Sequence, residues 1–139
     1  MKFYFLSLLA LIVFNACNSI ENKEVQTEKY EELKQKIEAD PSCAFEMKRI
    51  FSSPDKAYNI TSGYRICKEE ILTNEVIVFN KDEALGNKES NVYVSEDLRP
   101  IEVKWEGDSL LIYHYYKPAP LKKESSVYDI KVVYKQAEE

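Results

Sequence analysis

The stretch CAFEMKRIFSSPDKAYNITSGYRIC, residues 43–67, predicts a β-hairpin with a disulfide across its open end. Two runs of alternating apolar and polar residues, near 45–51 and 58–66, flank the turn sequence Ser53-Pro54-Asp55-Lys56. Cys43 and Cys67 are equally far from a turn centred on Asp55, so antiparallel pairing brings them face to face. Closing a loop of about 25 residues should stabilise the fold by roughly 3 kcal/mol.

The register of this hairpin contains a conflict. Pairing Cys43 with Cys67 places Phe45 opposite Arg65 rather than opposite an apolar residue. A slip of one residue would restore a common apolar face, but it would turn the two cysteines apart. A β-bulge at Gly63 reconciles both requirements, because glycine tolerates the backbone that a bulge needs. We therefore expect a bulge at Gly63.

One helix is predicted before this hairpin. Tyr30, Leu33 and Ile37 recur at helical spacing within Thr27–Ala39, and Asp40-Pro41 ends the pattern. Their narrow apolar stripe favours packing against a sheet, and a coiled-coil partner is the alternative.

Further strands are predicted after the hairpin. Ile71–Phe79 is apolar on both faces in its second half and predicts a central strand with cover on each side. Gly107-Asp108 suits a two-residue hairpin loop that opposes Trp105 to Leu110 and Val103 to Ile112. Short strands are also expected at 91–95 and 128–134. The fold class is mainly β (α+β): one N-terminal helix packed on an antiparallel meander or small sandwich of about six or seven strands.

The first seventeen residues predict a secretory signal that ends at a lipidated cysteine. Lys2 precedes an apolar run, Phe3–Phe14, which is too short to span a bilayer comfortably, and Asn15-Ala16-Cys17 follows. Lipid on the Cys17 thiol and its freed amine would give a stable anchor, because several acyl chains bind a membrane stably where one does not. The alternative is an ordinary secretory signal in which Cys17 is incidental. We expect a signal peptide over 1–16, a lipidated cysteine and tether over 17–26, and a single β-rich domain over 27–139.

Charge and cysteine count restrict the possible partners. Removing sixteen of the 139 residues leaves 123, enough for one domain, and changes the net charge from −5 to about −6 because Lys2 is lost. An acidic protein has no electrostatic reason to bind nucleic acid or anionic lipid head groups, so lipid rather than charge would hold it to the membrane. With Cys17 acylated, Cys43 and Cys67 remain to pair in an oxidising compartment, and their spacing is not that of a zinc site.

The remaining candidate residues are aromatic. Tyr113, Tyr115, Tyr116 and Tyr128 give a possible binding face, since tyrosine offers contact area at low entropic cost; packing in the core is the alternative. His114 is the only histidine, and no motif places a carboxylate and a nucleophile beside it, so we expect a structural residue. No catalytic residue, metal site or cofactor is predicted.

The order of these pieces resembles a group of small bacterial envelope proteins, many of them lipoproteins, that are classed together as a domain of unknown function. The residues that carry the resemblance are Cys43, Ser53-Pro54-Asp55, Tyr58, Cys67, Asn87-Lys88, Asn91-Val92-Tyr93-Val94, Val103, Trp105, Leu110-Leu111-Ile112, Ile130, Val132 and Tyr134. The chain departs from the group's pattern at Lys56-Ala57 and at Lys68–Ile71, where glycine or threonine is usual. The resemblance implies the fold, the cysteine pairing and the location only.

Together these features predict a lipid-anchored bacterial envelope protein on the extracytoplasmic side, in the periplasm or at the cell surface. We expect a non-enzymatic binding or structural module whose partner, besides the membrane, is an envelope protein or glycan. The alternative is a periplasmic inhibitor or immunity protein, for which the charged segment Asn80–Ser90 would be the protruding loop. An enzyme is the least favoured hypothesis.

Overall fold

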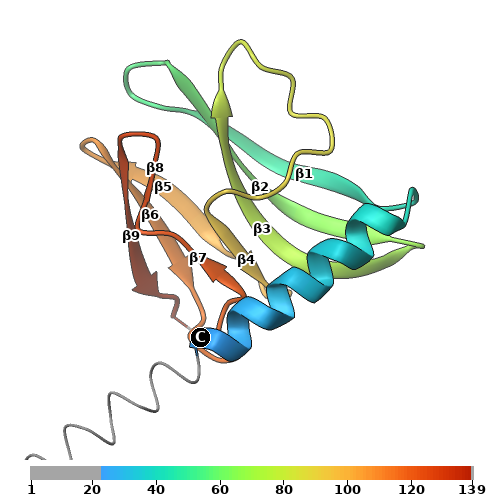
Figure 1. Cartoon of the computed structure of the whole chain (residues 1–139). Coiled ribbons are helices and arrows are strands. Elements are labelled where there is room, and N and C mark those ends of the chain that lie inside the picture. Colours follow the sequence, from blue (N-terminus) through green and yellow to red (C-terminus); the bar gives the residue numbers. More distant parts are fainter. Residues whose placement is uncertain (1–22, 139) are drawn as a thin grey trace, which may run out of the picture.

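The computed structural model describes residues 23–138 and contains one helix and two β-sheets (Figure 1). The strands are β1 (Ala44–Ser52), β2 (Tyr58–Cys67), β3 (Glu70–Asn80), β4 (Tyr93–Ser95), β5 (Glu102–Glu106), β6 (Ser109–His114), β7 (Lys122–Lys123), β8 (Ser126–Val127) and β9 (Ile130–Gln136). A five-stranded sheet has the order β1-β2-β3-β4-β7, and a four-stranded sheet has the order β5-β6-β9-β8. The predicted mainly β, α+β fold is confirmed.

The hydrophobic core is built from residues of both sheets. Ile60, Val76 and Val78 of the five-stranded sheet belong to the same buried cluster as Leu110 and Ile112 of the four-stranded sheet. All five are fully buried. Burial of aliphatic side chains at this density stabilises the fold by about 2 kcal/mol for each residue relative to its exposure.

The opposite face of the five-stranded sheet is covered by the helix, residues 23–39, and by the segment 81–92 (Figure 1). Ile77 and Phe79 point to this face and are buried, so β3 is buried on both sides, as its sequence predicts. The helix ends at 39, before Asp40-Pro41, as expected. It is already helical at 23, four residues earlier than predicted, and none of its residues is fully buried.

The hairpin of β1 and β2 has the predicted turn, in which the Lys56 N–H donates to the Ser53 carbonyl oxygen at 2.9 Å. Its bulge is displaced from the expected position. Phe45 pairs with Arg65 and Met47 with Gly63, and the register then shifts by one between Met47 and Arg49. The extra residue is thus Lys48 in β1, not Gly63 in β2.

Gly63 serves a different purpose from the one predicted. A Cβ atom there would overlap the Glu46 carbonyl oxygen and lie 2.8 Å from Cζ of Phe45. The two backbones approach so closely beside the bulge that only glycine fits. Met47 belongs to the alternating run predicted near 45–51, and it is 47% exposed on β1, which is an edge strand of its sheet.

In the four-stranded sheet, the predicted register of β5 and β6 is confirmed, but the predicted direction of β9 is wrong. Trp105 pairs with Leu110 and Val103 with Ile112, and Gly107 has a φ of 58° in the turn between them. However, β9 pairs with β6 in the parallel direction, whereas an all-antiparallel arrangement was expected. Tyr128 was expected in the last strand and lies instead in the β8–β9 turn, with a φ of 51°.

Candidate functional site

The disulfide joins Cys43, just before β1, to Cys67, the last residue of β2. Both cysteines are 4% exposed, and the predicted pairing is confirmed. The segment between the helix and β1 also holds the next turn, because the Lys68 N–H donates to Ser42 Oγ at 3.0 Å. Hydrogen bonds from Ser42 lower the pKa of Asp40, which keeps this carboxylate charged beside Lys68. The end of the helix, the disulfide and the β2–β3 turn therefore form one connected unit.

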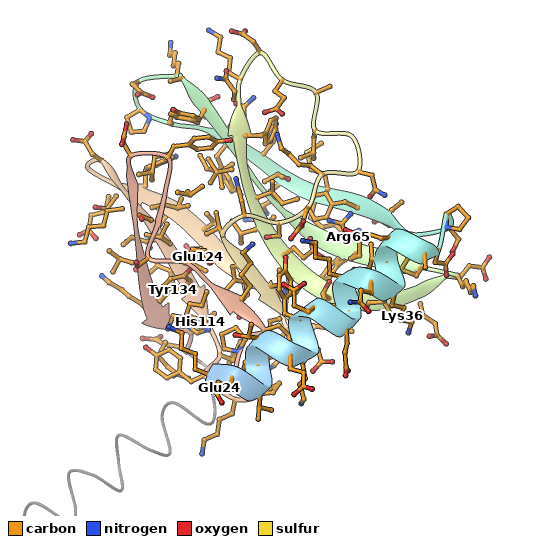
Figure 2. The ribbon with its side chains drawn as sticks, in the orientation of Figure 1. Glu24, Lys36, Arg65, His114, Glu124 and Tyr134 are labelled. Carbon is orange, nitrogen blue, oxygen red and sulfur yellow. A yellow bond between two sulfur atoms is a disulfide. The ribbon has the colours of Figure 1, made fainter. Side chains whose placement is uncertain are left out.

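Next to the disulfide, a buried ion pair between Arg65 of β2 and Glu75 of β3 lies between the five-stranded sheet and its cover. Arg65 is labelled in Figure 2. Arg65 Nη2 is 2.8 Å from Glu75 Oε2, and Arg65 Nε is 3.2 Å from Glu75 Oε1. Both side chains are 3% exposed. The Thr73 hydroxyl donates to Glu75 Oε1 at 2.7 Å. A buried pair of this kind is stable only when its hydrogen-bonding groups are satisfied, and here they are.

The same arginine fixes the segment 81–92. Arg65 Nη1 donates to Asn87 Oδ1 at 2.6 Å, and Nη2 donates to the Lys88 carbonyl oxygen at 2.8 Å. Asn87 Nδ2 in turn donates to the Cys43 carbonyl oxygen at 3.0 Å. Further along, Asn91 bonds both the N–H and the carbonyl oxygen of Val78. The base of this segment is therefore attached to the sheet by side chains that replace a neighbouring strand.

Between the helix and this segment lies a cleft of about 280 Å³, which we call the helix cleft. Its lining residues are Tyr30, Lys34, Ile37, Glu38, Asp40, Pro41, Cys43, Arg65, Asn87 and Glu89. At one side, Glu89 accepts a hydrogen bond from the Tyr30 hydroxyl at 2.7 Å and lies 3.2 Å from Lys34 Nζ. Burial and the bond to Glu89 raise the pKa of Tyr30, so its hydroxyl stays protonated. The cleft combines apolar walls with a floor of fixed polar groups, as small binding sites do.

The four tyrosines of the predicted binding face do not lie together. Tyr113, Tyr115 and Tyr116 lie in or just after β6, whereas Tyr128 lies in the β8–β9 turn and stacks on Tyr58 with 4.7 Å between ring centroids. Cations of the chain itself lie over three of these rings: Lys104 over Tyr113 at 4.5 Å, Arg99 over Tyr115 at 3.7 Å, and Lys123 over Tyr116 at 5.6 Å. These ring faces already have cation–π contacts, which reduces the aromatic surface available to a ligand.

His114 is 1% exposed and is surrounded by aromatic rings. Tyr93, Tyr116 and Tyr134 lie 4.9–5.4 Å from it between ring centroids. Its Nδ1 is 3.0 Å from the Tyr115 carbonyl oxygen, which can only accept, so Nδ1 carries the proton. Its Nε2 is buried and has no hydrogen-bond partner among the described residues. Burial, together with the Lys123 ammonium, lowers the pKa of His114.

Cys17, the predicted signal peptide and most of the predicted tether lie outside the described residues. Within 23–138, no group of three or more His, Cys, Asp or Glu side chains could hold a metal ion. In the same range, no helix is long and apolar enough to cross a membrane. No protein-family model, curated protein or solved structure matches the chain. A functional assignment therefore depends on the residues of this chain alone.

Proposed function

We propose that this protein is a lipid-anchored bacterial envelope protein, attached through Cys17, whose β-rich domain binds a partner outside the cytoplasm. The observation that carries the proposal is the disulfide between Cys43 and Cys67. The chain has three cysteines, so this pairing leaves Cys17, three residues after the end of the apolar run, as the one thiol that can be acylated. Disulfides persist in oxidising compartments, which supports a location outside the cytoplasm and the resemblance to envelope lipoproteins.

The helix cleft is the proposed binding site. Its floor is preorganised, because Arg65 and Asn87 are held by the sheet, the disulfide strand and each other before any ligand arrives. Ile37 and Pro41 supply apolar wall, and Glu38 is an exposed acid at the rim. Groups fixed in advance lose little entropy on binding. A site of this size accommodates one side chain of an envelope protein or one sugar unit of a glycan, and the acidic rim favours a ligand that is neutral or basic.

Cell fractionation tests the anchor. A tagged full-length Cys17→Ser variant should move from the membrane fraction to the soluble fraction of the envelope, because it cannot accept the diacylglycerol. Asn18→Ser is the matched control, since it changes the neighbouring residue and leaves the thiol in place. Membrane association of Cys17→Ser equal to that of the control would contradict the proposal.

Charge reversal tests the binding site. Glu38→Arg alters the rim of the helix cleft, and Glu32→Arg makes the same change on the same helix, at an exposed position that lines none of the described cavities. Chemical crosslinking of the tagged protein in intact cells should give partner bands that weaken in Glu38→Arg and persist in Glu32→Arg. Equal bands in the two variants would exclude the helix cleft as the binding site.

A second function, inhibition or immunity, is favoured by one feature of the segment 81–92. Its residues 81–84 are exposed, while its base is fixed by Arg65, Ser90 and Asn91. A firmly held exposed loop is what a protein inhibitor presents to its target. Asp82→Arg changes this loop without touching the cleft. Loss of the crosslinked partner in Asp82→Arg alone would favour the inhibitor, and loss in Glu38→Arg alone would favour the cleft.

A further inference from the structure

One end of the domain gathers the start of the helix, the connection between β6 and β7, and the end of β9 (Figure 1). A cavity of about 620 Å³ there is lined by Lys23 and Thr27 of the helix and by Leu121, Lys122 and Lys123. Tyr116 lies against His114 and under Lys123 at the same end. We call this region, defined by Lys23, Tyr116, Lys122 and Lys123, the helix-start end.

The opposite end consists of tight turns. Because β6 and β9 run parallel, with Ser109 paired to Lys131 and His114 to Gln136, the turns at Gly107 and Tyr128 lie together at the far end. Six residues of strand separate the two ends by about 20 Å. Tyr116 and Tyr128 are thus exposed tyrosines, 49% and 50% accessible, at opposite ends of one sheet.

The chain between Cys17 and the helix is short. Six Cα–Cα steps join Cys17 to Lys23, and even a fully extended chain of this length spans at most about 20 Å. We infer that the helix-start end faces the head groups of the membrane and that the turns near Tyr128 face away from it. This inference rests on the proposed lipid anchor at Cys17. An inverted domain would carry Lys23 about 20 Å from the bilayer, a distance that the tether covers only when it is fully extended.

The charges at this end indicate that the length of the tether, rather than electrostatic attraction to the lipid head groups, sets the orientation. Lys23, Lys122 and Lys123 are accompanied by Glu24, Glu28, Glu31 and Glu124, so the surface is close to neutral. Tyr116 is suited to the head-group layer, because its ring is apolar and its hydroxyl is polar. The orientation should therefore form on zwitterionic lipid and survive high salt.

Coupling the protein to lipid vesicles tests the orientation without depending on lipidation in the cell. In the chain from Cys17 onward, the oxidised protein has one thiol, Cys17, which can be coupled to a maleimide lipid in phosphatidylcholine vesicles. Tyr116→Trp and Tyr128→Trp place matched reporters at the two ends, and the single native Trp105, near the Gly107 turn, is a built-in reporter for the far end.

With nitroxide-labelled head groups, Tyr116→Trp should lose most of its added fluorescence, while Tyr128→Trp and the wild-type Trp105 should change little. Equal quenching of the two variants, or stronger quenching of Tyr128→Trp, would overturn the inference. A Gly/Ser insert of about 20 residues after Cys17 reaches an average span of about 25 Å and should remove the difference. If the two variants still differ in quenching when the insert is present, the length of the tether is not the cause of the orientation. Failure of the Cys17→Ser fractionation test would instead contradict the anchor and leave this measurement unaffected.

Discussion

Arg65 is buried and yet donates four hydrogen bonds: two to Glu75, one to Asn87 and one to the Lys88 carbonyl oxygen. Removing a charged pair from water costs several kcal/mol for each ion, and this cost is offset only when the buried groups are satisfied. The ion pair therefore adds little to the free energy of unfolding beyond what two well-packed apolar residues would add. Its role, we infer, is to fix where the segment 81–92 lies, because an unpaired arginine or glutamate at this depth would be strongly unfavourable.

Breaking the pair on one side should be costly. Arg65→Met leaves Glu75 buried and unpaired, and we expect the free energy of unfolding to fall by about 4 kcal/mol. Arg65→Met combined with Glu75→Leu removes both charges and should recover much of that loss. Urea denaturation of the two variants measures both values. A double variant no more stable than the single one would show that the ion pair does not account for the effect.

Gly63 tests the close approach of β1 and β2. In Gly63→Ala the new methyl overlaps the Glu46 carbonyl oxygen, and we expect a loss of about 3 kcal/mol in the free energy of unfolding. Gly86→Ala is the control: its methyl meets no atom within 4 Å, and only the φ of 52° opposes it, at about 1 kcal/mol. Denaturation curves in which the two variants are equally destabilised would contradict the steric account of Gly63.

His114 should make stability depend on pH. Burial and Lys123 lower its pKa in the folded state, whereas an unfolded chain titrates near about 6.5. The unfolded state then binds the proton more readily, so the stabilisation is complete above about pH 6.5 and is lost as the pH falls from there toward the folded pKa. Because the chain has one histidine, a single imidazole signal in an NMR titration reports the folded value. A midpoint at or above about 6.5 would rule out this contribution.

At the scale of elements, the β2–β3 turn carries backbone strain. Lys68 and Glu69 have φ values of 52° and 67°, a left-handed pair that tight hairpin turns usually fill with asparagine and glycine. Glu69→Gly should raise the free energy of unfolding by about 1 kcal/mol. Glu70→Gly, one residue further and inside β3, should lower it by a similar amount. Thermal unfolding distinguishes them, and destabilisation by Glu69→Gly would refute the assignment of strain to this turn.

The elements with strong local patterns were predictable from the sequence. Clean alternation with Gly107-Asp108 determined the β5–β6 register, and Asp40-Pro41 determined the end of the helix. The bulge was expected because two registers conflicted, but that conflict does not indicate which strand holds the extra residue. The direction of β9 was missed because alternation indicates which face of a strand is buried, not whether its neighbour runs parallel or antiparallel. The two-residue strands β7 and β8 are too short to produce a pattern.

The Arg65–Glu75 pair was not predicted, although a signal for it was present. The strand Ile71–Phe79 was predicted to be covered on both faces, and Glu75 lies within it. A carboxylate in such a strand is buried and needs a partner of opposite charge. Antiparallel pairing of β2 with β3 sets Gly63 opposite Glu75 and Arg65 opposite Thr73, which brings the arginine and the glutamate together on one face. The partners in the segment 81–92 could not be found in this way, because that segment has no periodicity.

At the scale of the whole molecule, the two ends of the domain have different roles in our proposal. The helix-start end lies toward the proposed anchor, the helix cleft opens beside the disulfide, and the Tyr128 turn lies at the opposite end of the four-stranded sheet. A partner could reach the cleft or the exposed residues 81–84 without meeting the bilayer. In this orientation, the proposed binding surface lies on the side of the domain, away from the lipid head groups.

Mass spectrometry of the protein extracted from membranes tests the lipid anchor most directly. We predict that the mature chain begins at Cys17 and that its N-terminal peptide carries the mass of a diacylglycerol, with Cys43 and Cys67 recovered as one disulfide-linked pair of peptides. A mature chain that begins elsewhere, or an N-terminal peptide with an unmodified Cys17 thiol, would contradict the account.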